Sequence, residues 1–308
     1  MSERPFRFGV QLRGVNTGQE WREKCRRVEA LGYDTLHVAD HFPRGLGPFA
    51  ALATATAITE RIRVGPFVLA NDFRHPAMLA KEAATLDLLS DGRLEVGIGA
   101  GWLRSEYEAT GIPFDRAGVR IDRLAEAIPL IKRLWTEENV TMQGRFYSVN
   151  ELSILPRPVQ APHPPVMVGG GGQRVLSLAA HHAEIVAINP RATPEGAPDR
   201  SDITAEVTAK KLTWVREAAG ERFPELELNI VVLRVDATDD REARAHQLAE
   251  ELQLTPGEVL ESPHVLLGTP DEMADALRQR RSRYGISYIS VTEDGLEPFA
   301  AVIERIAR

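Results

Sequence analysis

The chain has 308 residues, 43% of them hydrophobic and 26% charged, and its 44 acidic and 37 basic side chains give a formal net charge of −7. This acidic balance argues against nucleic acid as the main partner, and no apolar run approaches the roughly 20 residues needed to cross a bilayer. The composition suits an enzyme with a large core, and because the first residues lack the apolar segment of a signal peptide, we expect a cytoplasmic protein.

Short apolar strands alternate with helices in the first half of the chain. We predict strands at 6–12, 33–39, 62–71 and 94–99, and helices around 21–31, at 48–59, at 76–89 and at 121–135. Residues 146–149 indicate an inserted strand. The strands are little alternated, as expected of parallel strands that are buried on both faces. Cys25 lies in a helical pattern with Trp21 and Val28, which indicates a core residue rather than a nucleophile, and a single cysteine excludes a disulfide within the chain.

The alternation continues in the second half. Strands are predicted at 165–168, 184–188, 226–235 and 286–291, with helices after 173 and from about 239, 271 and 299. Residues 190–202 are rich in proline, glycine and charge and indicate an excursion over one barrel mouth. Eight strands with mostly helical crossovers predict an α/β fold, a (β/α)8 barrel, with residues 1–308 forming a single domain.

The glycine-rich stretch from Gly97 to Gly101 is the most informative local pattern. Glycines at 97, 99 and 101 allow close approach of a flat or phosphorylated ligand to the backbone, and a helix is expected to begin just after them. The same spacing fits the glycine-rich turn of a methyltransferase or of a dinucleotide-binding half. A methyltransferase is disfavoured because its motif follows the first strand of the domain, whereas three β/α units precede this one.

Polar or glycine residues directly follow several predicted strands. In a parallel barrel these positions gather at the carboxyl face, where active sites form. The candidate site residues chosen on this ground are Asp40, His41, Asn71, Gly99, Ala100, Gly101, Trp102, Gly169, Gly170, Gly171, Gly172 and Asn189.

Each candidate also has a purely structural interpretation. Asp40 and His41 are compatible with a helix cap beside a solvated histidine, or with proton exchange near neutral pH. The glycines at 169–172 fit a flexible turn, although a glycine run before a free helix N-terminus favours a phosphate. His75 is expected to be a positioned loop residue. His181 and His182, at a helix end, are expected to interact with the helix dipole, and no metal site is predicted.

Several motifs together resemble the luciferase-like monooxygenase superfamily, in particular the branch that uses the deazaflavin coenzyme F420. The motifs are Val10-Gln11-Leu12, Val38-Ala39-Asp40-His41, Arg74-His75-Pro76, Ser90-Asp91-Gly92-Arg93 within 88–94, the stretch from Gly97 to Trp102, Glu106-Tyr107 with Gly111-Ile112-Pro113-Phe114, and Gly268-Thr269-Pro270. The resemblance covers most of the chain and is densest over 6–172.

The resemblance implies a position for each part of the cofactor. The ring would lie across the barrel mouth, with Asp40 and His41 in ring contact and proton transfer. The bond Ala70-Asn71 matches the place of a bulge with a non-proline cis peptide. The cofactor side chain would lie beside the turn and the helix after it, and its phosphate on the second glycine run. The matching positions are Gly99, Ala100, Gly101, Trp102 and Ser105 for the side chain, Gly169, Gly170 and Gly171 for the phosphate, and Asn189 as a further contact.

One departure from the family pattern concerns the substrate. The sugar-phosphate dehydrogenases of this branch carry a glutamate directly after the glycine turn, where this chain has Trp102, which cannot supply a proton. Glucose 6-phosphate is therefore not the expected substrate. We predict an F420-dependent homodimeric oxidoreductase that acts on a small organic substrate, with reduction of C=C, C=O or C=N favoured and His41 moving the proton.

Two other functions stay open at this point. An FMN-dependent monooxygenase would use the same barrel with a flavin that reacts with oxygen. A flavin-binding barrel without catalysis is the second alternative, against which the intact Asp40-His41 pair and glycine loop argue.

Overall fold

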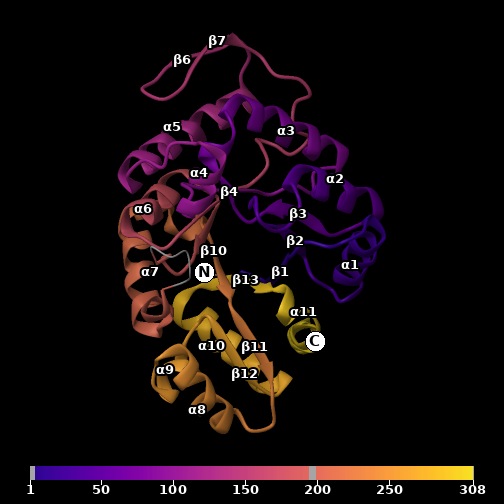
Figure 1. Cartoon of the computed structure of the whole chain (residues 1–308), viewed down its shortest axis with the longest axis vertical. Coiled ribbons are helices and arrows are strands. Elements are labelled where there is room, and N and C mark those ends of the chain that lie inside the picture. Colours follow the sequence, from indigo (N-terminus) through magenta and orange to yellow (C-terminus); the bar gives the residue numbers. More distant parts are fainter. Residues whose placement is uncertain (1–3, 194–198, 308) are drawn as a thin grey trace.

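The computed structural model describes residues 4–193 and 199–307 and shows a ring of parallel strands surrounded by helices (Figure 1). The strands of the ring are β1 (Arg7–Leu12), β2 (Thr35–Val38), β3 (Arg63–Pro66) with β4 (Leu69–Ala70), β5 (Val96–Gly99), β8 (Val166–Gly170), β9 (Ile185–Ile188), β10 (Glu227–Val232) and β13 (Ile286–Thr292). β1 lies between β2 and β13, and β4 pairs with β5. Since β3 and β4 are two parts of one strand position, and Val64 bridges to Leu94, the ring closes. The predicted (β/α)8 barrel is confirmed.

Helices form the outer layer of the barrel (Figure 1). They are α1 (Gly18–Ala30), α2 (Pro48–Ile58), α3 (Pro76–Leu89), α4 (Arg104–Thr110), α5 (Ala117–Thr136), α6 (Gln173–His182), α7 (Ala205–Ala219), α10 (Pro270–Tyr284) and α11 (Leu296–Ala307), with 3-10 turns η1 (Asn71–Phe73), η2 (Arg200–Ile203), η3 (Gly220–Glu225) and η4 (Glu293–Gly295). α3 has the predicted bounds, since Pro76 is pre-organised for the first helical position. α7, which the sequence analysis did not predict, begins after Thr204, whose side chain caps it.

The third strand is interrupted, and the interruption is not where the resemblance implied. The non-proline cis peptide bond joins Phe67 to Val68, so the expectation of a cis bond at Ala70-Asn71 is wrong. The break directly follows Pro66, which has no N–H to continue a hydrogen-bonded ladder. Ala70 instead lies in the regular second part of the strand, paired with Gly99.

A hairpin replaces the single inserted strand that was predicted at 146–149. It consists of β6 (Val140–Gln143) and β7 (Ser148–Leu152), which are antiparallel, and it projects beyond the helical layer (Figure 1). The Glu126 carboxylate accepts hydrogen bonds from the backbone N–H groups of Arg145, Phe146 and Tyr147 at 2.7–3.2 Å. These bonds hold the connection between the two strands, so the strand begins two residues later than predicted.

A second excursion lies between the last two barrel strands. The predicted strand 226–235 is in fact two strands, because β11 (Arg234–Ala237) leaves the barrel and pairs with β12 (Val265–Gly268). The change of partner occurs at Leu233, whose N–H donates to the carbonyl of His264 at 2.8 Å. Helices α8 (Arg241–Leu252) and α9 (Pro256–Glu261) accompany this small sheet and share a separate apolar cluster with it.

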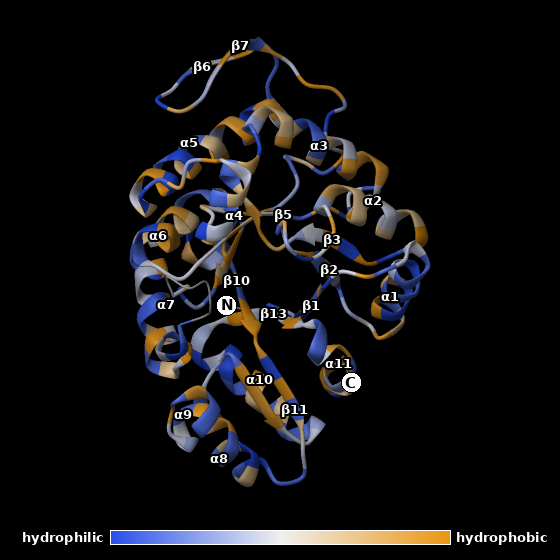
Figure 2. Cartoon of the chain, in the orientation of Figure 1, coloured by the Kyte–Doolittle hydropathy of each residue, from blue (hydrophilic) through white to orange (hydrophobic). Residues whose placement is uncertain are grey.

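The hydrophobic residues lie on the strands and on the inner faces of the helices (Figure 2). β2, β5 and β9 are buried at every position, as expected of parallel strands covered on both faces, and even the polar Thr35 and His37 of β2 are enclosed. Cys25 is fully buried in this core, as predicted. Within the described ranges, no helix combines the length and the apolar character required to cross a membrane.

Charged residues close the amino-terminal end of the barrel. Glu95 is buried beside the guanidinium groups of Arg7 and Arg63, the latter with Nε 2.7 Å from Oε1 of Glu95, and Arg7 also contacts Glu227 at 2.6 Å. Burial alone would raise the pKa of Glu95, but the two arginines outweigh it and hold the pKa below its ordinary value. All four residues lie at or just before the start of a strand. This end is therefore stabilised by ion pairs, and the opposite end remains for the site.

Candidate active site

Most of the predicted site residues lie at the carboxyl rim of the barrel. They are Asp40, His41, Ala70, Gly99, Ala100, Gly101, Gly169, Gly170 and Asn189. Ala70 pairs with Gly99 across β4 and β5, and the N–H of Asn189 donates to the carbonyl of Gly170 at 3.0 Å. Parallel barrels carry their active sites at this end. The rim thus brings together segments that are far apart in the sequence.

His41 lies in the loop just after β2, which ends at Val38, and is held by a buried carboxylate. Its Nδ1 lies 2.9 Å from Oε1 of Glu106, and the N–H of Phe42 donates to the same oxygen at 3.2 Å. The Glu106 side chain is only 4% exposed, while the His41 ring is 14% exposed. The sequence analysis quoted Glu106 in a motif but gave it no role. The only local signal was its place in the first turn of a helix directly after the glycine turn.

Asp40 is held tightly by its neighbours. Its carboxylate binds Arg74 through both oxygens, at 2.5 and 2.9 Å, and accepts the N–H of Ala70 at 3.1 Å. Burial alone would lower the pKa of Arg74, but its hydrogen bonds to Asp40 and the charge of that carboxylate raise the pKa above its ordinary value. The ion pair ties the loop after β2 to the residue that follows η1, and the bond from Ala70 ties it to the end of β4. Asp40 is therefore an anchor of the rim, and its contact with a cofactor ring stays a prediction.

Aromatic side chains surround His41. Its ring meets the ring of Trp102 edge to face at a centroid distance of 5.7 Å, and Phe42 meets Phe73 at 5.0 Å. Trp102 is 39% exposed and Phe42 59%, which is unusual for such large apolar side chains. The exposed surface beside the histidine is thus apolar as well as aromatic.

Two predicted contacts lie apart from the histidine. Asn71 is buried, and its Nδ2 donates to the hydroxyl of Tyr147 at 3.0 Å, so its side chain connects η1 to the inserted hairpin. Ser105 is exposed on α4, next to the buried Glu106. Among the described residues, neither side chain bonds to His41, and their binding of a cofactor stays a prediction.

The glycine turn after β5 is required by packing. Gly101 has φ +73°, and a Cβ on it would lie 1.8 Å from the hydroxyl of Tyr107. That hydroxyl donates to Asp72 at 3.3 Å. Since Tyr107 fills the space that a side chain at 101 would need, the turn holds α4 against the barrel, whether or not a ligand also contacts it.

The glycines of the second run differ from one another. A Cβ on Gly170 would lie 2.3 Å from Cγ1 of Val175, and one on Gly171 would meet the backbone of residues 189–191 at 2.6–2.8 Å. A Cβ on Gly172 would meet nothing within 4 Å. Gly172 is also the N-cap of α6, which has no side-chain cap. The open approach to this helix N-terminus therefore lies at Gly172, not at Gly170.

Asn189 is fixed by a buried ion pair behind it. Lys211, fully buried, donates to the carbonyl of Asn189 at 2.8 Å and to Asp202 at 2.5 Å. Burial lowers the pKa of Lys211. The Oδ1 atom of Asn189 is buried without a hydrogen-bond partner among the described residues. Such an atom needs a hydrogen-bond donor, which an ordered water or a bound molecule can supply.

The remaining predicted histidines do not join this site. The Nδ1 of His75 accepts the N–H of Ala77 at 3.2 Å and caps α3, as expected of a positioned loop residue. His181 and His182 lie in the last turn of α6. Burial and neighbouring positive charges, His181 first, lower the pKa of His182, so a charged ring at that helix end is not favoured. Over residues 4–193 and 199–307, no three metal-ligating side chains are gathered as a metal ion would require.

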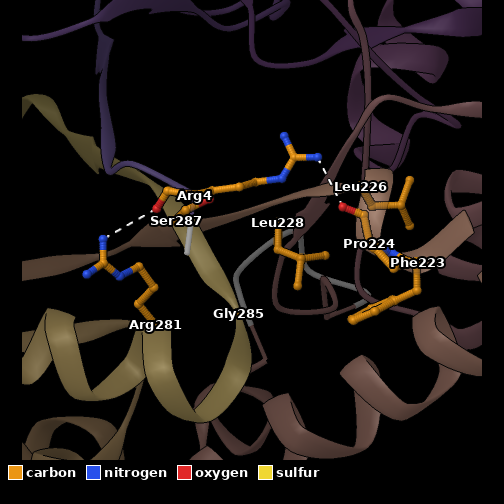
Figure 3. Close-up of a pocket in the computed structure, with 8 residues that line it drawn as sticks. All are labelled: Arg4, Phe223, Pro224, Leu226, Leu228, Arg281, Gly285 and Ser287. Atoms are coloured by element: carbon orange, nitrogen blue, oxygen red, sulfur yellow. Dashed lines mark hydrogen bonds between the residues drawn. The ribbon is translucent and has the colours of Figure 1, made fainter. Parts of the chain in front are cut away.

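A cavity of about 140 Å³ lies at the opposite, amino-terminal end of the barrel (Figure 3). Its arginines bind backbone: Arg4 donates to the carbonyl of Glu225 at 2.6 Å, and Arg281 donates to the carbonyl of Arg4 at 3.3 Å. The rest of its lining is mostly apolar and holds no acid–base pair. The chemistry of the rim, not this cavity, marks the candidate active site.

Comparison with protein families identifies one match over most of the chain. A family model described as luciferase-like monooxygenase matches residues 5–253.

Individual proteins also resemble this chain in sequence or in fold. An F420-dependent glucose-6-phosphate dehydrogenase of Intrasporangium calvum is 38% identical over 168 residues, which are 51% of this chain and 50% of that enzyme, so the chain matches only half its length. An uncharacterised protein of Mycobacterium tuberculosis is 34% identical over 293 residues, 87% of this chain and 93% of that protein. The coenzyme F420-dependent tetrahydromethanopterin reductase of Methanopyrus kandleri superposes with a TM-score of 0.78 at 18% identity, covering 98% of this chain and 100% of that one.

Proposed function

This chain belongs to the luciferase-like monooxygenase family, and from that premise we propose that it is an oxidoreductase that uses coenzyme F420 to transfer a hydride to or from a small organic substrate. The likeness to an F420-dependent dehydrogenase over half of the chain supports this cofactor. One observation carries the proposal. His41 stands at the carboxyl rim with Nδ1 bound to buried Glu106, and within the described chain its Nε2 makes no hydrogen bond.

The rim residues fit the proposed cofactor. A phosphate fits the uncapped N-terminus of α6, since the space around Gly172 is open. A polar donor fits the unpartnered Oδ1 of Asn189. When bound, the deazaflavin ring supplies or takes the hydride.

The chain's own residues do the rest of the chemistry. Reduction of a C=C, C=O or C=N bond adds a hydride at one atom and needs a proton at the other. In that direction His41 first takes a proton from solvent at Nε2 and then donates it to the substrate; in the oxidative direction the neutral Nε2 accepts the proton. Asp40 and Arg74 hold the loop that carries His41. Phe42 and Trp102 exclude water from the rim beside the ring because their exposed surfaces are apolar.

The proposal is tested by cofactor titration. Purified protein should bind coenzyme F420 more tightly than FMN, measured by fluorescence quenching and by the mass of any retained cofactor. A clear preference for FMN would identify the FMN-dependent monooxygenase instead. Binding of F420 without turnover of any C=C, C=O or C=N substrate would favour a non-catalytic binding barrel.

We also propose that glucose 6-phosphate is not the substrate. Trp102 occupies the place where the sugar-phosphate dehydrogenases of the branch carry a glutamate, and an indole cannot donate the proton which that carboxyl handles. An assay of F420 reduction with glucose 6-phosphate should show no activity above background. The homodimer and the cytoplasmic location stay predictions, and light scattering on the eluting protein checks the first.

A further inference from the structure

We propose that Glu106 is a positioning residue that fixes the tautomer and orientation of His41, so that Nε2 is the atom which exchanges the proton with the substrate. This inference rests on the proposed function for its catalytic consequence. Neither the family resemblance nor the description of any similar protein gives Glu106 a role.

The first step is the carboxylate. Glu106 is 4% exposed, and its Oε1 accepts from the N–H of Phe42 at 3.2 Å while lying 2.9 Å from Nδ1 of His41. An ionised carboxylate only accepts hydrogen bonds, so the hydrogen of this contact belongs to Nδ1. A buried carboxylate without these two donors would be costly to desolvate. The pair is therefore a built arrangement, not a chance surface contact.

The second step is the ring. A neutral imidazole that carries its hydrogen on Nδ1 has an unprotonated Nε2, which is the basic atom of the ring. That atom makes no hydrogen bond to the residues that the structure describes, and the ring is 14% exposed. The side chain can therefore gain or lose a proton at Nε2 without breaking its bond to Glu106. This division of the two nitrogens is the general arrangement of a carboxylate-oriented histidine.

The third step is the helix. α4 has only seven residues, but its inner face carries Glu106 beside fully buried Tyr107, whose hydroxyl donates to Asp72 at 3.3 Å. Gly101 leaves the space for that tyrosine. The position of Glu106 is thus fixed by packing that is independent of His41. A preformed partner lowers the cost of orienting the ring at the moment of reaction.

The test combines imidazole ¹⁵N NMR with kinetics of the full chain. At a pH where imidazole rings are neutral, the signal of His41, assigned as the one lost in His41→Asn, should show the Nδ1–H form in the wild type. In Glu106→Gln it should shift toward the Nε2–H form, because an amide both donates and accepts and no longer imposes one tautomer. With a working substrate, kcat should fall on the order of 10- to 100-fold while the Kd for F420 stays within about twofold.

Controls separate the possible failures. Glu108→Gln changes the same residue type on the same helix at an exposed position and should alter neither the spectrum nor kcat. Glu106→Asp should restore part of the Nδ1–H signal, and thermal melting shows whether each variant folds. A wild-type ring in the Nε2–H form, or a spectrum or kcat unchanged in folded Glu106→Gln, overturns the inference. Failure to bind F420 instead overturns the proposed function, and the NMR result then still decides the role of Glu106.

Discussion

Two neighbouring residues after β2 have different tasks because they have different partners. Both carboxylate oxygens of Asp40 accept hydrogen bonds from Arg74, and one of them also accepts from the N–H of Ala70. The charge of Asp40 is therefore already neutralised by a hydrogen-bonded cation. His41 has one nitrogen bound to Glu106 and one left for a substrate. A group whose hydrogen bonds are complete is poorly suited to proton transfer, whereas a group with one free basic atom is well suited. At the scale of single residues, these contacts support our proposal that His41, rather than Asp40, is the acid–base group of the rim.

The corresponding prediction concerns His41→Ala. Turnover should fall by about 10²–10⁴-fold, the usual contribution of a general acid–base group, while the affinity for F420 changes little. Steady-state kinetics and cofactor titration measure the two effects separately. His181→Ala, at an exposed helix end, is the control and should match the wild type. Near-normal turnover of His41→Ala would make His41 a packing residue and leave protonation to water.

Asp40→Asn provides a contrasting case. Its amide would lose the charge-assisted bonds to Arg74, which lies partly buried beside it. We expect a lower melting temperature together with reduced activity, since the loop that carries His41 loses its anchor. Loss of activity at unchanged stability would instead assign Asp40 a direct part in the chemistry.

At the scale of elements, the connection from β8 to α6 combines packing with binding. The sequence favours a phosphate loop throughout 169–172. The structure leaves no room for a side chain at Gly170, because Val175 of α6 has its Cγ1 2.3 Å from the place of a Cβ there. Valine is branched at Cβ and cannot swing away without moving the helix.

The prediction for this element concerns Gly172. Gly172→Leu should retain the melting temperature, since a Cβ there meets nothing within 4 Å, and should weaken F420 binding by obstructing the N-terminus of α6. Gly170→Leu is the matched variant and should lower the melting temperature. Thermal melting and cofactor titration of both proteins distinguish the two roles. Unchanged affinity in Gly172→Leu would show that no ligand phosphate approaches this helix.

At the scale of the whole molecule, two buried histidines couple stability to pH. His37 lies inside the barrel on β2, and His264 directly precedes β12. Burial lowers the pKa of each from 6.5 to about 4. The unfolded chain then binds protons between these values that the folded chain does not. The free energy of unfolding should therefore fall as the pH is lowered through this interval, by up to about 3 kcal/mol for each ring.

Chemical denaturation at several pH values between about 7 and 5 measures this effect. Asp34 and Glu227, whose pKa values are raised mainly by burial, act in the opposite direction, so variants must be compared. His264→Asn should show a weaker pH dependence than the wild type. The control His246→Asn, at an exposed site on α8, should not. An equal slope for wild type and His264→Asn would mean that this ring takes up its proton equally readily in the folded protein and in the unfolded chain.

The sequence by itself determined the barrel, most of its strands and helices, and the rim position of His41. These features depend on neighbours along the chain. Pro76 begins α3 at the predicted residue, and uninterrupted apolar runs indicate strands buried on both faces. Because parallel strands share one direction, residues that follow them meet at one rim whatever the details of packing.

Only the tertiary structure decided which rim residues act together. His41 and Glu106 are 65 positions apart, and nothing in either local pattern reveals that a carboxylate on a seven-residue helix meets a histidine beyond another strand. Likewise, Gly170 and Gly172 look alike in sequence but differ in what lies opposite their Cα atoms. Local periodicity and caps are set by short-range sterics and hydrogen bonding, whereas partners and empty space depend on how separate elements pack, which no single segment encodes.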